Sequence, residues 1–153
     1  GLFSVETLEG LPAIRSIILY GSVSRGVANR DSDVDLLVLV DSDKSVGERI
    51  QQLSQVEDSG RTREELDWLD SHETRTHIST LPLTKDEAMN FPPILLDVLE
   101  DGTPIVDDGT FREIRSVLRA RLVEAGARRE FLSPNEWYWD LAPRLAAGEV
   151  YAL

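Results

Sequence analysis

The chain has 153 residues, of which 41% are hydrophobic and 29% charged, a composition typical of one globular domain. No apolar run approaches the roughly 18 residues that a membrane-spanning helix needs, and the lack of cysteine excludes disulfides, thiolate nucleophiles and cysteine-bound zinc. With 28 acidic and 16 basic residues the net charge is -12. This charge repels nucleic-acid phosphates and argues against nucleic acid as a general ligand.

The N-terminal residues show no export signal. Residues 1–10 have neither a basic start nor a sustained apolar stretch, so we expect a cytoplasmic protein. Gly1 stands where an initiator Met is expected, which leaves open an N-terminal region that precedes this sequence. Apart from Lys44 and Lys85, all basic residues are arginines. Together with the acidic excess, this bias is typical of a salt-adapted organism, or simply of an arginine-rich, GC-rich genome.

Strand and helix patterns alternate in the first third of the chain. Residues 13–20 are mostly apolar and β-branched and end at Gly21, which predicts a strand that enters a tight turn. Residues 33–40 predict a second strand, and its continuously apolar second half indicates burial. Residues 46–56 repeat apolar side chains at helical spacing and predict a helix.

The capping-box pattern, Ser or Thr followed three residues later by Glu or Gln, marks three further helix starts. These are Thr62 with Glu65, Thr84 with Glu87, and Thr110 with Glu113. Between the first two, residues 74–83 predict a third strand, whose Pro82 places its end near a sheet edge.

Proline and glycine mark the boundaries of the remaining elements. The Pro92–Pro93 pair restarts a helix that runs to Gly102, and residues 105–106 predict a short strand. The last long helix ends at Gly126. Beyond it we predict an irregular tail with the aromatic residues Trp137, Tyr138 and Trp139. Such side chains either stack on bases or, as is more common, pack onto the domain.

The segment LYGSVSRGVANRDSDVDLLVLV, residues 19–40, carries the chemistry. Gly21 and Ser22 follow a strand, where backbone N–H groups and a hydroxyl can cradle phosphate, and glycine permits close backbone approach. Asp33 and Asp35 are two residues apart on a strand, so both carboxylates point to one face and can share a hard cation. Each feature alone also fits an ordinary turn or a solvated strand end. Together they supply both halves of a metal–nucleotide site.

This segment resembles the nucleotidyltransferase superfamily that includes DNA polymerase β, and most closely its small prokaryotic members, the minimal nucleotidyltransferases. The matching motif is GSVSRG followed by DSDVD. The wider resemblance covers a motif core of about residues 13–83. It implies an α/β (α+β) nucleotidyltransferase fold, a small mixed β-sheet flanked by helices, in a single domain over residues 1–153. A C-terminal helix and aromatic tail, residues 110–153, would complete it.

The resemblance also implies roles for the motif residues. Asp33 and Asp35 would be catalytic carboxylates that bind Mg²⁺, with Mn²⁺ as the alternative. The residues that would hold the NTP are Gly21, Ser22, Arg25, Gly26 and Ser32. The implied reaction transfers an NMP group to an acceptor hydroxyl and releases pyrophosphate. Because many small relatives modify a partner toxin protein, the resemblance implies a toxin or HEPN-type protein as the partner and an antitoxin-like role for this chain.

One expected residue is missing from the pattern. Active members of the superfamily usually have a third acidic residue on the neighbouring strand, whereas here that strand reads RTHISTLPL. His77 is the nearest substitute and can act as a base near pH 7, but a half-buried structural histidine is the simpler interpretation. Asp67, Asp70 and Glu73 are further candidates. The gap keeps open an alternative function, a catalytically weak or inactive nucleotide-binding or regulatory subunit of a partner complex.

The HETRTH segment, residues 72–77, does not fit a zinc-protease site. Its histidines are five residues apart, whereas the protease pattern needs a separation of four on a helix so that both imidazoles share one face. The interspersed threonines favour a strand instead.

Overall fold

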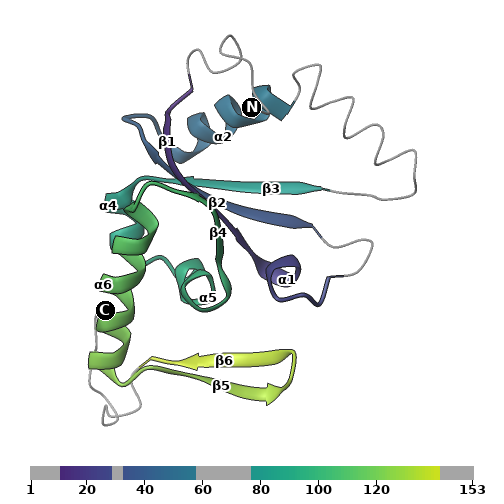
Figure 1. Ribbon diagram of the computed structural model, residues 1–153, viewed down its shortest axis with the longest axis vertical. Coiled ribbons are helices and arrows are strands. Elements are labelled where there is room, and N and C mark those ends of the chain that lie inside the picture. Colours follow the sequence, from purple (N-terminus) through teal and green to yellow (C-terminus); the bar gives the residue numbers. More distant parts are fainter. Residues whose placement is uncertain (1–10, 29–32, 58–76, 142–153) are drawn as a thin grey trace.

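The computed structural model describes residues 11–28, 33–57 and 77–141. In these ranges Figure 1 shows a four-stranded sheet flanked by helices and a separate two-stranded hairpin. The predicted α/β fold with a small mixed sheet is confirmed. The predicted helix at Thr62 and the first residues of the predicted third strand, 74–76, lie outside the described ranges.

The strands of the main sheet are β1 (Ala13–Tyr20), β2 (Val34–Asp41), β3 (Ile78–Leu83) and β4 (Thr103–Asp107), in the order β3-β2-β1-β4. Strands β2 and β3 are parallel, while β1 is antiparallel to both β2 and β4. The helices are α1 (Gly21–Ser24), α2 (Val46–Glu57), α4 (Lys85–Met89), α5 (Ile94–Asp101) and α6 (Thr110–Ala125). Within the described ranges, no helix has the length and apolar content that a membrane crossing requires.

The core lies between one face of the sheet and the helices α4, α5 and α6. Ile18, Leu37 and Leu39 are buried there against Leu99 of α5 and Phe111 of α6. Side chains of a strand point alternately to the two faces of the sheet, so every second residue of β2 shares the face of Leu37 and Leu39. Asp35 therefore belongs to the face of the sheet that packs against these helices, and Asp33 directly precedes β2.

A buried arginine ties α2 to α4 and β3. Arg49 is 4% exposed, and its guanidinium donates to both carboxylate oxygens of Glu87, at 2.6 and 3.2 Å. It also donates to the carbonyl of Pro82 at 3.1 Å. Glu87 in turn completes a capping box with Thr84, as the sequence predicts. The guanidinium of Arg49 thus links α2 to both α4 and β3.

The predicted capping box at Thr110 is wrong. Helix α6 begins after Gly109, and no side chain of the capping residue bonds to its first turn. Instead Asp107 Oδ1 accepts from the amides of Gly109 (2.9 Å) and Phe111 (3.1 Å). The Thr110 hydroxyl donates to Asp108 at 2.6 Å and is not available as the cap. Two neighbouring carboxylates, which are stronger acceptors than a hydroxyl, take over the helix start.

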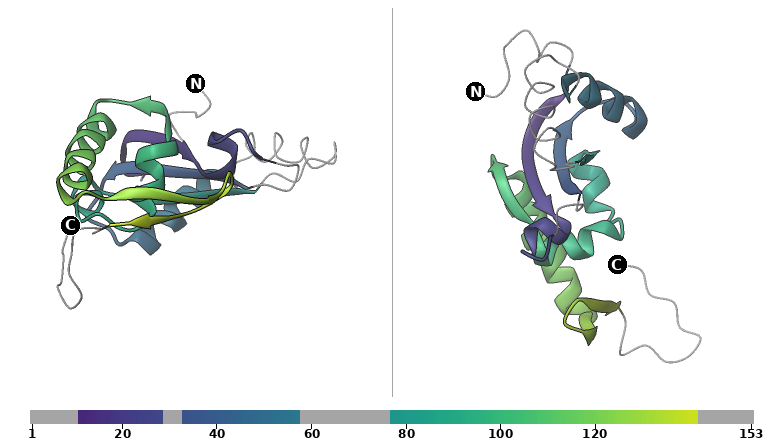
Figure 2. Two further views of the ribbon diagram at one scale, coloured as in Figure 1. Left: turned by 90° about the horizontal axis from the view of Figure 1, so that it is seen from below. Right: turned by 90° about the vertical axis from the view of Figure 1, so that its right-hand side faces the viewer.

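The predicted irregular tail is also wrong over its described part. Strands β5 (Arg128–Ser133) and β6 (Glu136–Asp140) form an antiparallel hairpin, next to the end of α6 and apart from the main sheet (Figure 2). The indole N–H groups of Trp137 and Trp139 both donate to Asp97 of α5, at 3.1 and 3.2 Å. The two tryptophans therefore pack onto the domain, as favoured from the sequence, whereas Tyr138 is exposed.

Candidate active site

The motif residues gather where β1 ends and where β2 and β3 begin. Because β1 and β2 are antiparallel, Tyr20 at the end of β1 lies opposite Asp35. Because β2 and β3 are parallel, Ser79 lies beside Asp35 on the other side. Helix α1 starts directly after Tyr20 and lies at the same end of the sheet (Figure 1). The topology thus brings the glycine-serine turn and the carboxylates together.

Gly21 and Asp35 are in direct contact. Gly21 has φ +78°, and a Cβ at this position would overlap Asp35 Oδ2. The glycine therefore leaves room for the carboxylate, a requirement that spacing along the chain does not indicate. Gly26 also has a positive φ, +71°, but a Cβ there would meet open space. Only the backbone conformation requires glycine at this second position.

The two carboxylates repel each other. Burial and the charge of Asp33 both raise the pKa of Asp35, against the lowering effect of Arg25. Burial, followed by the charge of Asp35, raises the pKa of Tyr20. Both Tyr20 and Asp35 are therefore harder to ionise than usual. A cation bound between the carboxylates would relieve the repulsion between their negative charges.

The carboxylates of Asp33 and Asp35 fit a divalent cation that is also bound by phosphate oxygens. Carboxylate oxygens are the ligands that hard divalent cations prefer, and Asp33 is exposed enough to reach a ligand, with a side chain 59% exposed. In the part of the chain that the structure describes, no three His, Asp or Glu side chains converge on one point. Asp33 and Asp35 could therefore hold a cation only together with phosphate or water oxygens, or with groups outside the described ranges.

His77 lies beside the carboxylate pair. Its Nδ1 is 4.0 Å from Asp33 Oδ1, and its carbonyl accepts from the Val34 amide at 2.8 Å. The interpretation as a half-buried strand residue is wrong, because His77 precedes β3 and its side chain is 77% exposed. Its role as a base stays a prediction. The other candidates for the third acid, at positions 67, 70 and 73, lie outside the described ranges.

Arg25 caps the C-terminal end of α1. It is exposed, its charge offsets part of the rise in the pKa of Asp35, and its guanidinium carbon lies 4.8 Å from the centre of the Trp137 ring. The sequence offered no signal for this contact, since the two residues belong to elements at opposite ends of the chain. Binding of phosphate by Ser22 and Arg25 stays a prediction, and Ser32 lies outside the described ranges.

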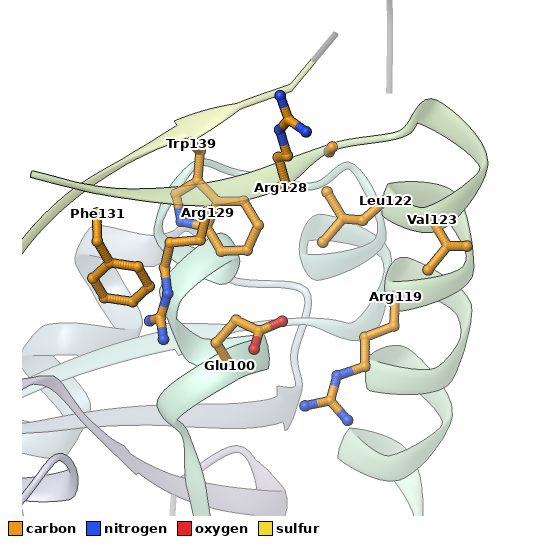
Figure 3. A pocket seen from close by; sticks show the side chains of 9 residues that line it. Glu100, Arg119, Leu122, Val123, Arg128, Arg129, Phe131 and Trp139 are labelled. Atoms are coloured by element: carbon orange, nitrogen blue, oxygen red, sulfur yellow. The ribbon is translucent and has the colours of Figure 1, made fainter. Parts of the chain in front are cut away.

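A pocket of about 400 Å³ lies away from the motif, between α6, the end of α5 and the hairpin (Figure 3). Its walls include Arg119 and Leu122 of α6 and Arg129, Phe131 and Trp139 of the hairpin. None of the motif residues lines it.

A family model described as a nucleotidyltransferase domain matches residues 4–105. This range is about two thirds of the chain and contains the whole motif, strands β1 to β3 and the first residues of β4. The chain therefore belongs to the nucleotidyltransferase domain family. Members of this family typically use an NTP and divalent metal ions.

The chain is also similar to several solved structures. One is a toxin–antitoxin crystal structure with AMP-PNP, at 18% identity, 78% coverage of this chain, 83% of that chain and a TM-score of 0.48. Another is the toxin–antitoxin pair MntA–HepT, at 15% identity, 78% and 80% coverage and a TM-score of 0.43. A third is tri-AMPylated Shewanella oneidensis HEPN toxin in complex with MNT antitoxin. The identity is 16%, the match covers 78% of this chain and 80% of that chain, and the TM-score is 0.45. No curated protein matches the chain significantly in sequence.

Proposed function

We propose that this protein transfers an NMP group from an NTP to an acceptor hydroxyl, with Mg²⁺ as the cation and Mn²⁺ as the alternative. The observation that carries this proposal is the contact between Gly21 of the phosphate-loop motif and the carboxylate of Asp35. This contact supports a single site in which the predicted phosphate-binding turn lies beside one of the predicted metal ligands, in a chain that belongs to the nucleotidyltransferase domain family.

The side chains of the site would act by position and charge. Asp33 and Asp35 would hold the cation, which when bound neutralises negative charge on the phosphates. The turn at Gly21 and Ser22, with the guanidinium of Arg25, would orient the triphosphate so that an acceptor oxygen can attack the α-phosphorus in line. A bond forms between that oxygen and phosphorus, the bond to the pyrophosphate oxygen breaks, and the hydroxyl proton passes to a base. We propose His77 as this base, because its Nδ1 lies 4.0 Å from Asp33 Oδ1.

A partner protein is the acceptor that we favour. The motif resembles that of the minimal nucleotidyltransferases, many of which modify a partner toxin protein. The net charge of -12 disfavours an RNA end as the acceptor, because both surfaces are negative. We therefore propose an antitoxin-like enzyme of the cytoplasm, and a HEPN-type toxin is the first acceptor to test.

One observation favours a second function. Strand β3, Ile78–Leu83, has no acidic residue in the sheet position next to Asp35, where Ser79 stands instead. A site with two carboxylates can hold a metal–nucleotide without organising a fast transfer. The second candidate is therefore a nucleotide-binding regulatory subunit of a partner complex.

Two measurements separate these functions. In calorimetry with ATP, CTP, GTP and UTP, both functions require NTP binding that Mg²⁺ strengthens, and changing Asp33 and Asp35 together to Ala should abolish the Mg²⁺ dependence. If the double variant binds the metal–nucleotide as tightly as the parent, the site is wrongly assigned. Radiolabel transferred from an α-labelled NTP to a HEPN-type protein supports the enzyme, and Mg²⁺-dependent binding without transfer to any acceptor supports the regulatory subunit.

A further inference from the structure

The motif arginine is contacted from outside the region that defines the family. Trp137 lies on β6, beyond residues 4–105 of the family match, and its ring centre is 4.8 Å from the guanidinium carbon of Arg25. A planar cation at this distance is attracted by the negative face of an indole ring. The C-terminal hairpin thus reaches back to the predicted phosphate loop.

The indole of Trp137 is itself held on several sides. Its N–H donates to Asp97 of α5 at 3.1 Å, and its ring centre lies 5.9 Å from that of Phe131, its cross-strand neighbour. The guanidinium of Arg129 lies 4.9 Å from the centres of both rings. Figure 3 shows Arg129 and Phe131 side by side on the hairpin. The ring that contacts Arg25 is therefore fixed in its orientation.

Asp101, at the end of α5, joins the hairpin to α1. Its carboxylate accepts from Arg129 at 2.9 Å, and both of these side chains are largely buried. Its carbonyl accepts from the hydroxyl of Ser24, the residue before Arg25. Helix α1 and the hairpin are thus anchored to the same residue, which keeps Trp137 in register with Arg25.

The contact with Trp137 leaves Arg25 with hydrogen-bond donors for a ligand. An aromatic ring occupies the face of a guanidinium, whereas its five N–H donors point outward from the edge. Among the described residues, the Arg25 side chain forms neither an ion pair nor a hydrogen bond. Without the ring, a long exposed side chain would sample many rotamers, and binding would have to order it at an entropic cost.

We propose that Trp137 is a positioning residue of the nucleotide site, which holds Arg25 with its N–H edge free to bind the triphosphate. This inference rests on the proposed function, because it takes the NTP as the ligand of Arg25. It adds the β5–β6 hairpin to the parts of the molecule that determine nucleotide affinity.

The test is a double-mutant cycle of Arg25→Ala and Trp137→Leu, read by calorimetry with the Mg²⁺ complex of the tightest-binding NTP. We expect Trp137→Leu to weaken binding about two- to fivefold, the usual size of an exposed cation–π contact. In the Arg25→Ala background it should have no further effect, because its action passes through the arginine. Trp137→Phe, which keeps an aromatic face but loses the bond to Asp97, should retain most of the affinity.

Tyr138→Leu is the matched control. Tyr138 is the next residue on β6, points to the other face of the hairpin and is 52% exposed, so this variant should bind like the parent. If Trp137→Leu binds like the parent, or loses the same factor with and without Arg25, the inference is wrong while the proposed function stands. If the parent binds none of the four NTPs with Mg²⁺, the proposed function fails, and the inference fails with it.

Discussion

At the scale of single residues, the contact of Gly21 with Asp35 combines a folding constraint with a functional one. Gly21→Ala should destabilise the protein more than Gly26→Ala, although both positions have a positive φ. At Gly26 the cost is the backbone strain alone, about 1 kcal/mol. At Gly21 the new methyl group also displaces the carboxylate of Asp35. Urea unfolding of the two variants measures the difference.

The same pair supplies its own control. In the Asp35→Ala background the carboxylate is gone, and Gly21→Ala should then cost no more than Gly26→Ala. Equal costs at both glycines in the parent background would show that the Gly21 position tolerates a side chain and that the contact has no energetic consequence.

At pH values at which Asp35 is ionised, this residue should lower the free energy of unfolding. Burial, with the charge of Asp33, raises its folded-state pKa, so the folded state favours the protonated carboxyl more than the unfolded state does. This cost is absent below the unfolded pKa of about 3.9 and present above the raised folded pKa. Asp35→Asn should therefore raise Tm at pH 7 in the absence of metal and nucleotide, and the gain should shrink as the pH falls toward 4.

Thermal unfolding across this pH range checks the sign. The exposed Asp43 provides the control, since Asp43→Asn should leave Tm nearly unchanged at every pH. A lower Tm of Asp35→Asn at pH 7 would mean that the ionised carboxylate stabilises the fold. It would remove the argument that a cation relieves repulsion at this site.

At the scale of elements, the ion pair of Arg49 and Glu87 should matter more than any exposed pair. Hydrogen bonding to Arg49 lowers the pKa of Glu87 against the effect of burial, so its stabilisation is present above the ordinary Glu pKa of about 4.3 and is lost as the pH falls through the lowered value. Glu87→Gln leaves Arg49 buried without its counter-charge and should cost about 2 to 3 kcal/mol at pH 7.

Denaturant unfolding at pH 7 and at low pH measures this cost. Lys85 and Glu113 form the comparison, an ion pair of 2.8 Å between exposed side chains. Glu113→Gln should cost less than about 1 kcal/mol. If the two variants are equally stable at pH 7, the pair at Arg49 does not hold α2, α4 and β3 together as described.

Patterns within short segments correctly predicted the elements that depend mainly on residues close together in the sequence. The strand Ala13–Tyr20 and the helix from Val46 were predicted from hydrophobic periodicity, and the Thr84 capping box from residues three apart. The α6 cap was mispredicted because the helix starts one residue earlier than a Thr110 cap requires: the Glu113 amide donates to the carbonyl of Gly109, and the carboxylates at 107 and 108 accept from the amides of Phe111 and Thr110. The hairpin was missed although Pro134 and Asn135, between two short β-prone runs, are a turn signal.

The site was predicted only as far as one continuous segment could show it. Gly21, Arg25, Asp33 and Asp35 belong to a motif within one stretch of sequence, and the structure brings that stretch to one end of the sheet. The overlap that a side chain at Gly21 would meet, the position of Ser79 beside Asp35 and the stacking on Trp137 all depend on how distant segments pack. No spacing along the chain encodes them.

At the scale of the whole molecule, the net charge of -12 should make stability depend on salt. Repulsion among excess acidic residues acts mainly in the compact state, where the charges are closer together than in the unfolded chain. Because the Debye length falls from about 10 Å at 0.1 M salt to about 3 Å at 1 M, KCl should raise Tm steeply at first and then level off. A gain on the order of 1 kcal/mol corresponds to about 2–4 °C for a domain of this size.

A variant with less charge separates screening from a general salt effect. Asp43, Glu124 and Glu136 are exposed, and changing all three to their amides removes three negative charges. This triple variant should have a higher Tm than the parent at 50 mM KCl and gain less from added salt, because there is less repulsion to screen. A Tm that rises equally in both proteins and keeps rising beyond 1 M would instead reflect salt excluded from the protein surface. In that case the acidic excess would not be a determinant of the stability of this fold.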